Sequence, residues 1–454
     1  MITLVATRSH LLRWCGLVLG LPVIALTLVV LSDAIPDRFI TRPIHDAILD
    51  ETISENSLSV GFTGGQVDGF SECKRMTVGL GAPEGWSTFE SAVRSPTLGS
   101  CRLAESKILG WAQGDVLERS FDYYRYWNGS TVVLRPAVAA FGVAGTRLAA
   151  AAALIAVTTA FALALRRRVG PSATALLLVP LLLTTDFIDL PGALLHAIGM
   201  TVAIGGAAMM LRLLRAESSV QTYAAAAFTT GAASLFFADL TNPDASWALV
   251  ACSAAVVAVG TDQLAGAVRR SAASAVGWIV GFGWMWATKW VIAASVVGFA
   301  AVRDQIRNKT EERLQGEVRG VDNSQFQGLR RAWGAWWNQP LIGLVVVVLV
   351  VVAAVLASRR RDLASTWRRR VLIGAPAAIP FVWHIVMRQH TVIHAWFTYR
   401  SFPVAFGIVL LALTARLDSS SPNVGEHGDD QGDDVELKGI EPLTSSLRTT
   451  RSTN

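Results

Sequence analysis

The amino-acid sequence predicts an all-α integral membrane protein with about ten transmembrane helices and a large extracytoplasmic loop after the first helix. Two observations support this fold class. The chain is 52% apolar and only 16% charged, whereas soluble domains carry about 25% charged residues. Long apolar segments recur along the chain, and about a hundred residues of mixed polarity separate the first segment from the second.

Each predicted span approaches or exceeds the roughly 17–25 apolar residues that cross the hydrocarbon core. The spans are 14–31, 145–165, 172–188, 192–213, 220–238, 246–266, 274–300, 340–357, 371–388 and 401–416. The first is longer than the core of a signal peptide and lacks an A-x-A-like cleavage site, so we expect a retained anchor. Pro180 interrupts the third span, which carries the weakest signal.

Basic residues predict the orientation, because Lys and Arg concentrate in cytoplasmic loops. The net charge of +6 is therefore interpreted as a topology signal, and no nucleic-acid partner is expected. The arginines that fall on one side of the spans are Arg8, Arg13, 166–168, Arg212, Arg215, Arg269, Arg270, 359–361 and 368–370. We expect a multi-pass protein of the bacterial cytoplasmic (inner) membrane with both termini in the cytoplasm.

Residues 1–417 are predicted to form one polytopic membrane domain, with outer loops at 32–136 and 302–339. The composition becomes polar and rich in aspartate after residue 417, which predicts a disordered cytoplasmic tail at 418–454. The end of this tail, from Lys438, resembles tails produced when a reading frame runs through a transfer-RNA gene. No function is expected of it.

Two of the four cysteines, Cys73 and Cys101, fall in the first outer loop. Two cysteines in an oxidising compartment favour a disulfide. Closing a loop of about 29 residues would contribute about 3 kcal/mol in the chain-entropy estimate. The alternative is two free thiols or a metal pair, although no neighbouring His or Cys completes a tetrahedral set.

Asp68 and Glu72 stand four residues apart beside the first of these cysteines. If the stretch opens a helix, both acids share one face, where a carboxylate could accept the proton of an attacking hydroxyl or bind a divalent cation. Both are therefore candidate catalytic residues. The alternative is structural: Asp68 or Ser71 caps the helix, and Glu72 lies in its favourable first turn.

The segment 121–129 is rich in tyrosine and precedes the second span. Aromatic and arginine side chains at that depth typically form a membrane-interface belt. They can also bind substrate, since aromatic faces stack on sugar rings and Arg125 or Arg135 could hold a lipid phosphate.

Two charged residues lie at or within apolar segments, where ionised groups are usually functional. Asp239 directly follows the fifth span, although Asp239 to Pro243, like Asp186 and Asp189 earlier, also fits a simple turn. Lys289 lies inside the seventh span between tryptophans. It is either a functional residue or the partner of Asp186, Asp189 or Asp239 in an ion pair.

Three histidines fall within eleven residues after the ninth span, and His390 and His394 would share a helix face. This spacing occurs in zinc sites. The alternatives are hydrogen bonding to phosphate or sugar and packing at the interface. Arg400, expected at the outer surface, is a candidate phosphate clamp.

Four stretches resemble landmarks of an uncharacterised family of bacterial polytopic membrane proteins, which is itself similar in layout to GT-C superfamily glycosyltransferases. They are YYRYWNGSTVVLRP, FFADLTNP, GWIVGFGWMWATKWVIA and QHTVIHAWFTYR, and the resemblance covers roughly residues 10 to 417. It implies a polyprenyl-phosphate sugar as lipid-linked donor, a cell-envelope acceptor, and an acid of the first outer loop as base, best matched by Asp68 or Glu72. Asn128 and Gln389 depart from the expected pattern.

The resulting hypothesis is a glycosyltransferase whose acids and cations line one outer cavity. The residues expected there are Asp68, Glu72, Asp239, Lys289, His390, His394 and Arg400. No nucleotide-binding motif is present, which argues against an ATP-driven pump. A secondary transporter, which would also use intramembrane charges, and a noncatalytic envelope-assembly protein are the alternatives.

Overall fold

The computed structural model describes residues 2–53, 58–60, 66–261, 263–315, 324–360 and 362–417, so the predicted tail at 418–454 lies outside the described residues. The described chain is an all-α membrane protein with five segments long and apolar enough to cross a membrane. They are Trp14–Asp33, Thr131–Val169, Leu194–Leu213, Leu264–Val297 and Ala395–Thr414. A sixth candidate is a pair of helices, Gln327–Trp337 and Ile342–Ser358, that meet at 88°.

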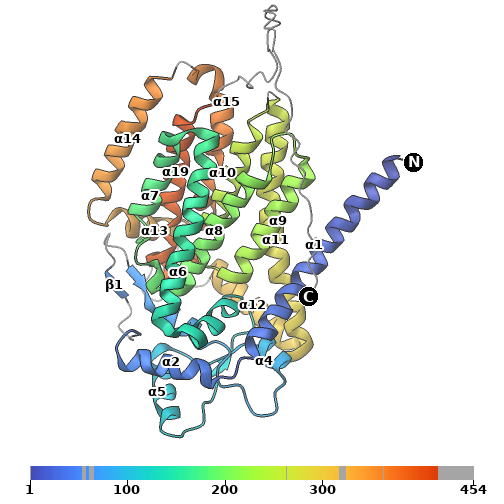
Figure 1. Ribbon diagram of the computed structural model, residues 1–454, viewed down its shortest axis with the longest axis vertical. Helices are drawn as coiled ribbons and strands as arrows, with labels where there is room; N and C mark the ends of the chain where they lie inside the picture. The colour runs from blue at the N-terminus through green and yellow to red at the C-terminus, as the bar shows by residue number, and fades with distance from the viewer. Residues whose placement is uncertain are drawn as a thin grey trace, which may run out of the picture. The chain divides into compact units, whose positions relative to one another are not determined.

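Every predicted span coincides at least in part with helix. Most of these helices lie side by side in one bundle, whereas α1 runs obliquely away from it toward the N-terminus (Figure 1). The helices are α1 (Ile2–Asp33), α6 (Thr131–Val169), α7 (Pro171–Leu183), α8 (Leu194–Leu213), α9 (Val220–Ala238), α10 (Pro243–Ala258), α11 (Leu264–Val297), α14 (Ile342–Ser358), α15 (Leu363–Gly374), α16 (Ile379–Val386) and α19 (Ser401–Thr414). Since only five or six of these segments meet the criteria for crossing, the count of ten spans stays a prediction.

The structure departs from the predicted segments at two places. The apolar run 371–388 is broken, because α15 ends at Gly374 and a 3-10 turn, η2 (Ala375–Ala378), precedes α16. Pro376 and Pro380 lack the backbone N–H that a continuous helix requires. The predicted loop 302–339 is largely helical where it is described, within α12 (Phe299–Gln315) and α13 (Gln327–Trp337).

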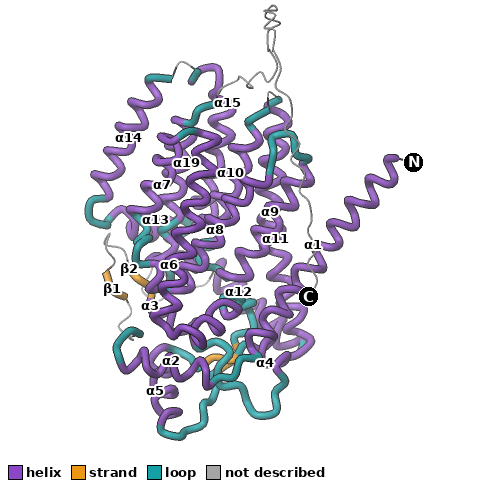
Figure 2. The backbone as a smooth tube through the Cα atoms, viewed as in Figure 1, coloured by secondary structure: helices purple, strands orange, loops and turns teal. Residues whose placement is uncertain are grey.

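The first predicted loop forms a small folded layer at one end of the bundle, hereafter the loop end (Figures 1 and 2). Its elements are α2 (Arg38–Leu49), β1 (Leu58–Val60), β2 (Gln66–Asp68), α3 (Gly69–Met76), α4 (Thr88–Arg94), β3 (Pro96–Thr97), α5 (Cys101–Ala112) and β4 (Phe121–Asp122). The strands pair antiparallel, Leu58 opposite Asp68 and Pro96 opposite Asp122. Three short elements complete the described chain: η1 (Leu190–Gly192), α17 (Arg388–Ile393) and α18 (Ala395–Thr398).

An apolar core and a disulfide hold this layer together. Ile40, Ile44, Leu80 and Leu98 are buried together with Leu134 of α6, so the core joins the layer to the bundle. The predicted bond between Cys73 and Cys101 is confirmed: it links α3 to the first residue of α5, with the two Cα atoms 5.6 Å apart.

Helices α9 and α11 approach so closely that only glycine fits between them. A Cβ atom on Gly231 would lie 2.0 Å from the carbonyl oxygen of Trp278, and one on Gly281 would lie 2.1 Å from that of Phe228. Small residues permit such backbone contact between membrane helices, where dispersion forces replace the hydrophobic effect as the source of association. The seam fixes the position of α11 against α9. Both helices reach the loop end, so the seam also positions the residues that they carry there.

We expect Gly281→Val to separate this seam, because its side chain would overlap the α9 backbone. Overpacking of this kind costs about 1–3 kcal/mol or more. The thermal unfolding temperature and the folded yield of the purified protein should both fall. Gly283→Val is the matched control, since a Cβ at Gly283 meets nothing within 4 Å. Equal stability of the two variants would contradict the seam.

Candidate functional site

A cavity of about 130 Å³ lies between the first-loop layer and the bundle. We call it the cationic cavity, because three basic side chains reach its wall. The residues that line it through polar or aromatic groups are Ser71, Lys74 and Arg75 of α3, then Tyr123, Arg125 and Tyr126 before α6, Asp239 and Thr241 between α9 and α10, and His390, His394 and Phe397 near α17 and α18.

A buried ion pair joins the two sides of this cavity. Arg75 donates through Nη2 to Asp239 Oδ2 and through Nη1 to Asn128 Oδ1 at 2.5 Å. Asn128 in turn donates through Nδ2 to the backbone oxygens of Tyr123 and Tyr126, each at 3.2 Å. One guanidinium therefore fixes α3, the turn after α9 and the tyrosine segment relative to one another.

The backbone at Asp239 is strained. Its φ of 51° and ψ of −117° place a residue with a side chain in a region that few such residues adopt. The carboxylate is 5% exposed, and its Oδ1 lacks a hydrogen bond of good geometry among the described residues, although the Asn128 backbone N–H lies nearby. The turn thus holds a buried carboxylate at the cavity wall, with Oδ2 bound by Arg75 and Oδ1 near the Asn128 backbone N–H.

The other two cations of the cavity, Lys74 and Arg125, both contact the ring of Tyr123. Lys74 Nζ lies 4.5 Å from the centre of the Tyr123 ring, and Arg125 Cζ lies 4.2 Å from the same centre. Burial lowers the pKa of Lys74, and the positive charges of Arg125 and Arg75 lower it further against the opposing influence of Tyr123. Burial alone would raise the pKa of Tyr123, but the surrounding charges of Arg125, Lys74 and Arg75 hold it below its usual range. The cavity is strongly electropositive.

Two histidines close the cavity on the side of α17. The His390 and His394 rings are 4.8 Å apart, His390 Nε2 lies 3.3 Å from the Leu240 carbonyl oxygen, and His394 stacks on Phe397. Within the described part of the chain, no group of three or more His, Cys, Asp or Glu side chains is arranged to hold a metal ion.

Four of the predicted site residues meet here: Arg125, Asp239, His390 and His394 line the cationic cavity. The two predicted catalytic acids do not line it. Asp68 caps α3, accepting from Ser71 N at 3.0 Å and facing His196 Nε2 at 3.0 Å. Glu72 receives a bidentate contact from Arg147 at 3.1 and 2.6 Å. These contacts match the structural alternative, in which Asp68 caps the helix and Glu72 lies in its first turn.

The net effect of these contacts on the two acids differs. Burial would raise the pKa of Asp68, but its hydrogen bond with His196, the charge of that histidine and the donors of Ser71 hold the pKa well below its usual range. Burial raises the pKa of Glu72 despite the opposing charge of Arg147. Asp68 acts as an anchor, since it holds Ser71, which does reach the cavity.

Two predicted phosphate-binding arginines also lie elsewhere. Arg135 donates to the backbone oxygens of Ser32 at 3.1 Å and Ile35 at 2.6 Å, and it pairs with Asp37 at 3.1 Å. Arg400 donates through Nε to the Thr185 carbonyl oxygen at 3.1 Å and is 1% exposed. Both side chains tie chain segments together and neither lines the cationic cavity.

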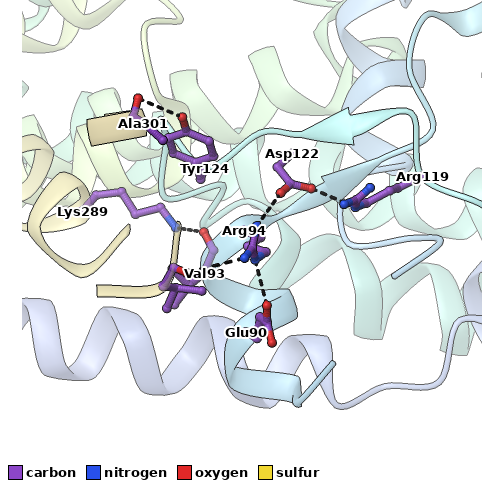
Figure 3. Close-up of polar contacts among 9 residues, drawn as sticks. Glu90, Val93, Arg94, Arg119, Asp122, Tyr124, Lys289 and Ala301 are labelled. Carbon is purple, nitrogen blue, oxygen red and sulfur yellow. Dashed lines mark hydrogen bonds and ion pairs between the residues drawn. The ribbon is translucent and has the colours of Figure 1, made fainter. Parts of the chain in front are cut away.

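Lys289 donates to a helix terminus, and of the predicted acids Asp239 lies close enough to act on it electrostatically. Its Nζ donates to the Val93 carbonyl oxygen at 2.8 Å (Figure 3). A cation is favourable there, because Val93 lies in the last turn of α4. The neighbouring Arg94 contacts Glu90, Asp122 and the Val296 carbonyl oxygen, which strengthens the same attachment of the layer to α11.

Sequence reasoning missed Lys74, Arg75, Tyr123 and Tyr126 as individual residues. A signal for the first two was present, because Ser71, Lys74 and Arg75 stand at helical spacing i, i+3 and i+4 and so share one face. The tyrosines belong to the segment 121–129, which was considered as a whole for sugar stacking.

Comparison with known proteins identifies no relatives: no family model, no curated protein and no solved structure matches this chain.

We expect Arg75→Met to destabilise the protein by about 3–5 kcal/mol, because it strands the buried Asp239 carboxylate. The double variant Arg75→Met with Asp239→Asn should recover part of this loss, as measured by thermal unfolding of purified protein. The exposed pair Arg307 and Glu311 on α12 is the matched control, and breaking it should cost about 0–1 kcal/mol. If the stability lost in the double variant equalled the sum of the losses in the two single variants, the two residues would not be a coupled pair.

Proposed function

We propose that this chain is a membrane glycosyltransferase of GT-C-like layout, which transfers a sugar from a polyprenyl-phosphate donor to a hydroxyl of a cell-envelope acceptor. The observation that carries the proposal is the cationic cavity, in which three basic side chains and one strained, buried carboxylate meet beneath a folded loop layer. Phosphate binding and proton transfer, the two tasks of such a reaction, need these side chains.

The charges of the cavity suit the departing phosphate. Lys74, Arg75 and Arg125 against Asp239 give a formal charge of three minus one, or +2. A lipid-phosphate sugar is a phosphodiester with one negative charge, and the monoester that leaves carries about −1.5 to −2 at neutral pH. The negative charge therefore grows as the sugar departs. Fixed cations stabilise the transition state more than the bound donor, which is the condition for catalysis.

Asp239 is the candidate base in this proposal, in place of Asp68 or Glu72. The acceptor hydroxyl oxygen forms a bond to the anomeric carbon, and its proton passes to Asp239. The bond between that carbon and the phosphate oxygen breaks, and its electron pair stays on the phosphate. Arg75 binds Oδ2, so Oδ1, which is buried near the Asn128 backbone N–H, is the proposed proton acceptor. Ser71 and Thr241 add hydroxyl groups that can hold the sugar.

The proposal places the loop end on the extracytoplasmic side and both termini in the cytoplasm, in a bacterial inner membrane crossed by about ten spans. Arginines support this orientation, because 166–168 lie in the last turn of α6 and Arg269 lies near the start of α11, at the ends of these helices that are remote from the loop end. Reporter fusions at Gly81 and Arg360 should report outside and inside, respectively. The opposite pattern would overturn the orientation.

Asp239→Asn should reduce sugar transfer by about 10²–10⁴-fold, the usual contribution of a positioned base. The assay incubates purified protein with radiolabelled polyprenyl-phosphate sugars and membrane acceptors. Asp122→Asn is the matched control, because this acid pairs with Arg94 and Arg119 outside the cavity. Donor binding by Asp239→Asn, measured separately, shows that the variant is folded. Full activity of Asp239→Asn would refute the assigned base, and uptake of a solute without transfer would favour a transporter.

Phosphate affinity should fall as the pH rises. The fall should begin at a lower pH than it would if Lys74 titrated like an ordinary lysine, whose pKa is about 10.4. The sign follows from charge: Lys74 binds an anion when protonated, and this contribution is lost as pH rises through its lowered pKa. Lys74→Arg should remove this part of the pH dependence, because arginine stays protonated.

The controls for this pH experiment separate the neighbouring groups. Tyr123→Phe removes a second titration of the same sign, since deprotonated Tyr123 repels the anion. Lys107→Arg, a lysine bound to Glu118 and Ser120 outside the cavity, should leave the profile unchanged. A profile unaffected by Lys74→Arg would exclude Lys74 from the anion site.

A further inference from the structure

A second cavity, of about 170 Å³, adjoins the cationic cavity. The two share Arg125 and Tyr126 in their walls. The second is otherwise lined by Trp286 and Trp290 of α11, by Met387, and by Gln305, Lys309 and Thr310 of α12. We call it the aromatic cavity, because its deep wall consists of tryptophan and tyrosine rings.

The aromatic wall is held in place by hydrogen bonds to one carbonyl group. Trp286 and Trp290 both donate through Nε1 to the Arg125 backbone oxygen, at 3.3 and 3.2 Å. The Tyr126 ring stacks on Trp286 at 22° with 6.3 Å between centres. The tryptophan N–H groups are thereby satisfied, so the faces that remain for a ligand are apolar.

The opposite wall, α12, is attached to the same segment of chain. The Tyr124 hydroxyl lies 3.5 Å from the Ala301 carbonyl oxygen in the first turn of α12 (Figure 3). Val302 is buried with Val93 and Ala293, which fixes this turn against α4 and α11. The segment 124–126 therefore contacts both walls, and the cavity is preformed.

Arg125 marks the boundary between two chemical environments. Its guanidinium lies over Tyr123 in the cationic cavity, while its backbone oxygen anchors the tryptophans of the aromatic cavity. A ligand that occupies both spaces needs an anionic group on one side of Arg125 and a hydrocarbon chain on the other. A free phosphate or a sugar phosphate would use the first cavity alone.

We propose that the aromatic cavity binds the head-proximal part of the hydrocarbon chain of a phosphorylated lipid whose phosphate lies in the cationic cavity. This proposal rests on the proposed function for the anionic group and adds a second, separate site for the chain. Trp286, Trp290 and Tyr126 supply the apolar surface, and Lys309 and Gln305 of α12 add polar groups to the lining.

The test measures binding of radiolabelled inorganic phosphate to the purified full chain and its displacement by methyl phosphate and by farnesyl phosphate. Farnesyl phosphate should displace the label at a concentration about tenfold or more below that of methyl phosphate, because only its chain can bury apolar surface. Farnesol alone, which lacks the phosphate, measures the displacement caused by the chain without a headgroup.

Thr310→Trp should fill the aromatic cavity without removing any of the hydrogen bonds that build it. In this variant the advantage of farnesyl phosphate should disappear, while displacement by methyl phosphate stays unchanged and shows that the protein is folded. Asn308→Trp is the matched control, since Asn308 is an exposed residue of the same helix that does not line the cavity.

The outcomes separate the two proposals. Equal displacement by methyl and farnesyl phosphate in the unaltered protein, or a farnesyl advantage that survives Thr310→Trp, overturns the chain site and leaves the anion site standing. If the unaltered protein does not bind phosphate, both proposals are overturned.

Discussion

The buried ion pair between Arg75 and Asp239 is the contact on which the cavity depends. Arg75 belongs to the folded loop layer and Asp239 to the bundle, so the pair sets the distance between them. The same guanidinium reaches Asn128, whose amide holds the backbone of the tyrosine segment. Three walls of the cavity therefore meet at one side chain. Moving any one of the three segments would leave a buried charge without its partner, which is strongly unfavourable. The positions of the three segments therefore depend on one another.

The cavity keeps like charges close together. Asp239 neutralises one of the three cations, and the Tyr123 ring is in cation–π contact with the other two, Lys74 and Arg125. These contacts hold the cationic groups in the cavity wall. Cations that are fixed in this way need little reorganisation when an anion binds, which is the property that gives fixed charges their effect in a water-poor site. The glycine seam between α9 and α11 supports this by holding Asp239 and the tryptophans of α11 on one rigid frame.

Apolar runs in the sequence were sufficient to locate the bundle helices, since each run of suitable length must satisfy its own backbone in a membrane. The break at Pro376 and the helices α12 and α13 were missed, because local turns and interface helices leave no long apolar signal. Asp239 was found because charge beside apolar chain is costly unless it is used, and Arg125 was found because it lies in the tyrosine-rich segment before the second predicted span.

The partners of the site residues could not be deduced in the same way. Asp68 meets His196 across 128 residues and Glu72 meets Arg147 across 75, so only the fold reveals that both acids are already engaged. The Lys289 ammonium donates to a helix carbonyl, that of Val93, whereas its position inside an apolar span had suggested a functional role or a carboxylate partner. Arg75 lies two residues after Cys73, which was singled out, yet its role depends on a turn 164 residues away.

The disulfide gives this arrangement a dependence on compartment. Cys73 directly precedes Lys74 and Arg75, and its bond to Cys101 tethers the helix that presents both cations. Thiols stay reduced in the cytosol and pair in oxidising compartments. In the proposed orientation, which places the first loop outside the cytoplasm, a newly made chain lacks this tether until that loop has been exported and oxidised. In that orientation, assembly of the cavity is a step of maturation that depends on delivery of the loop across the membrane.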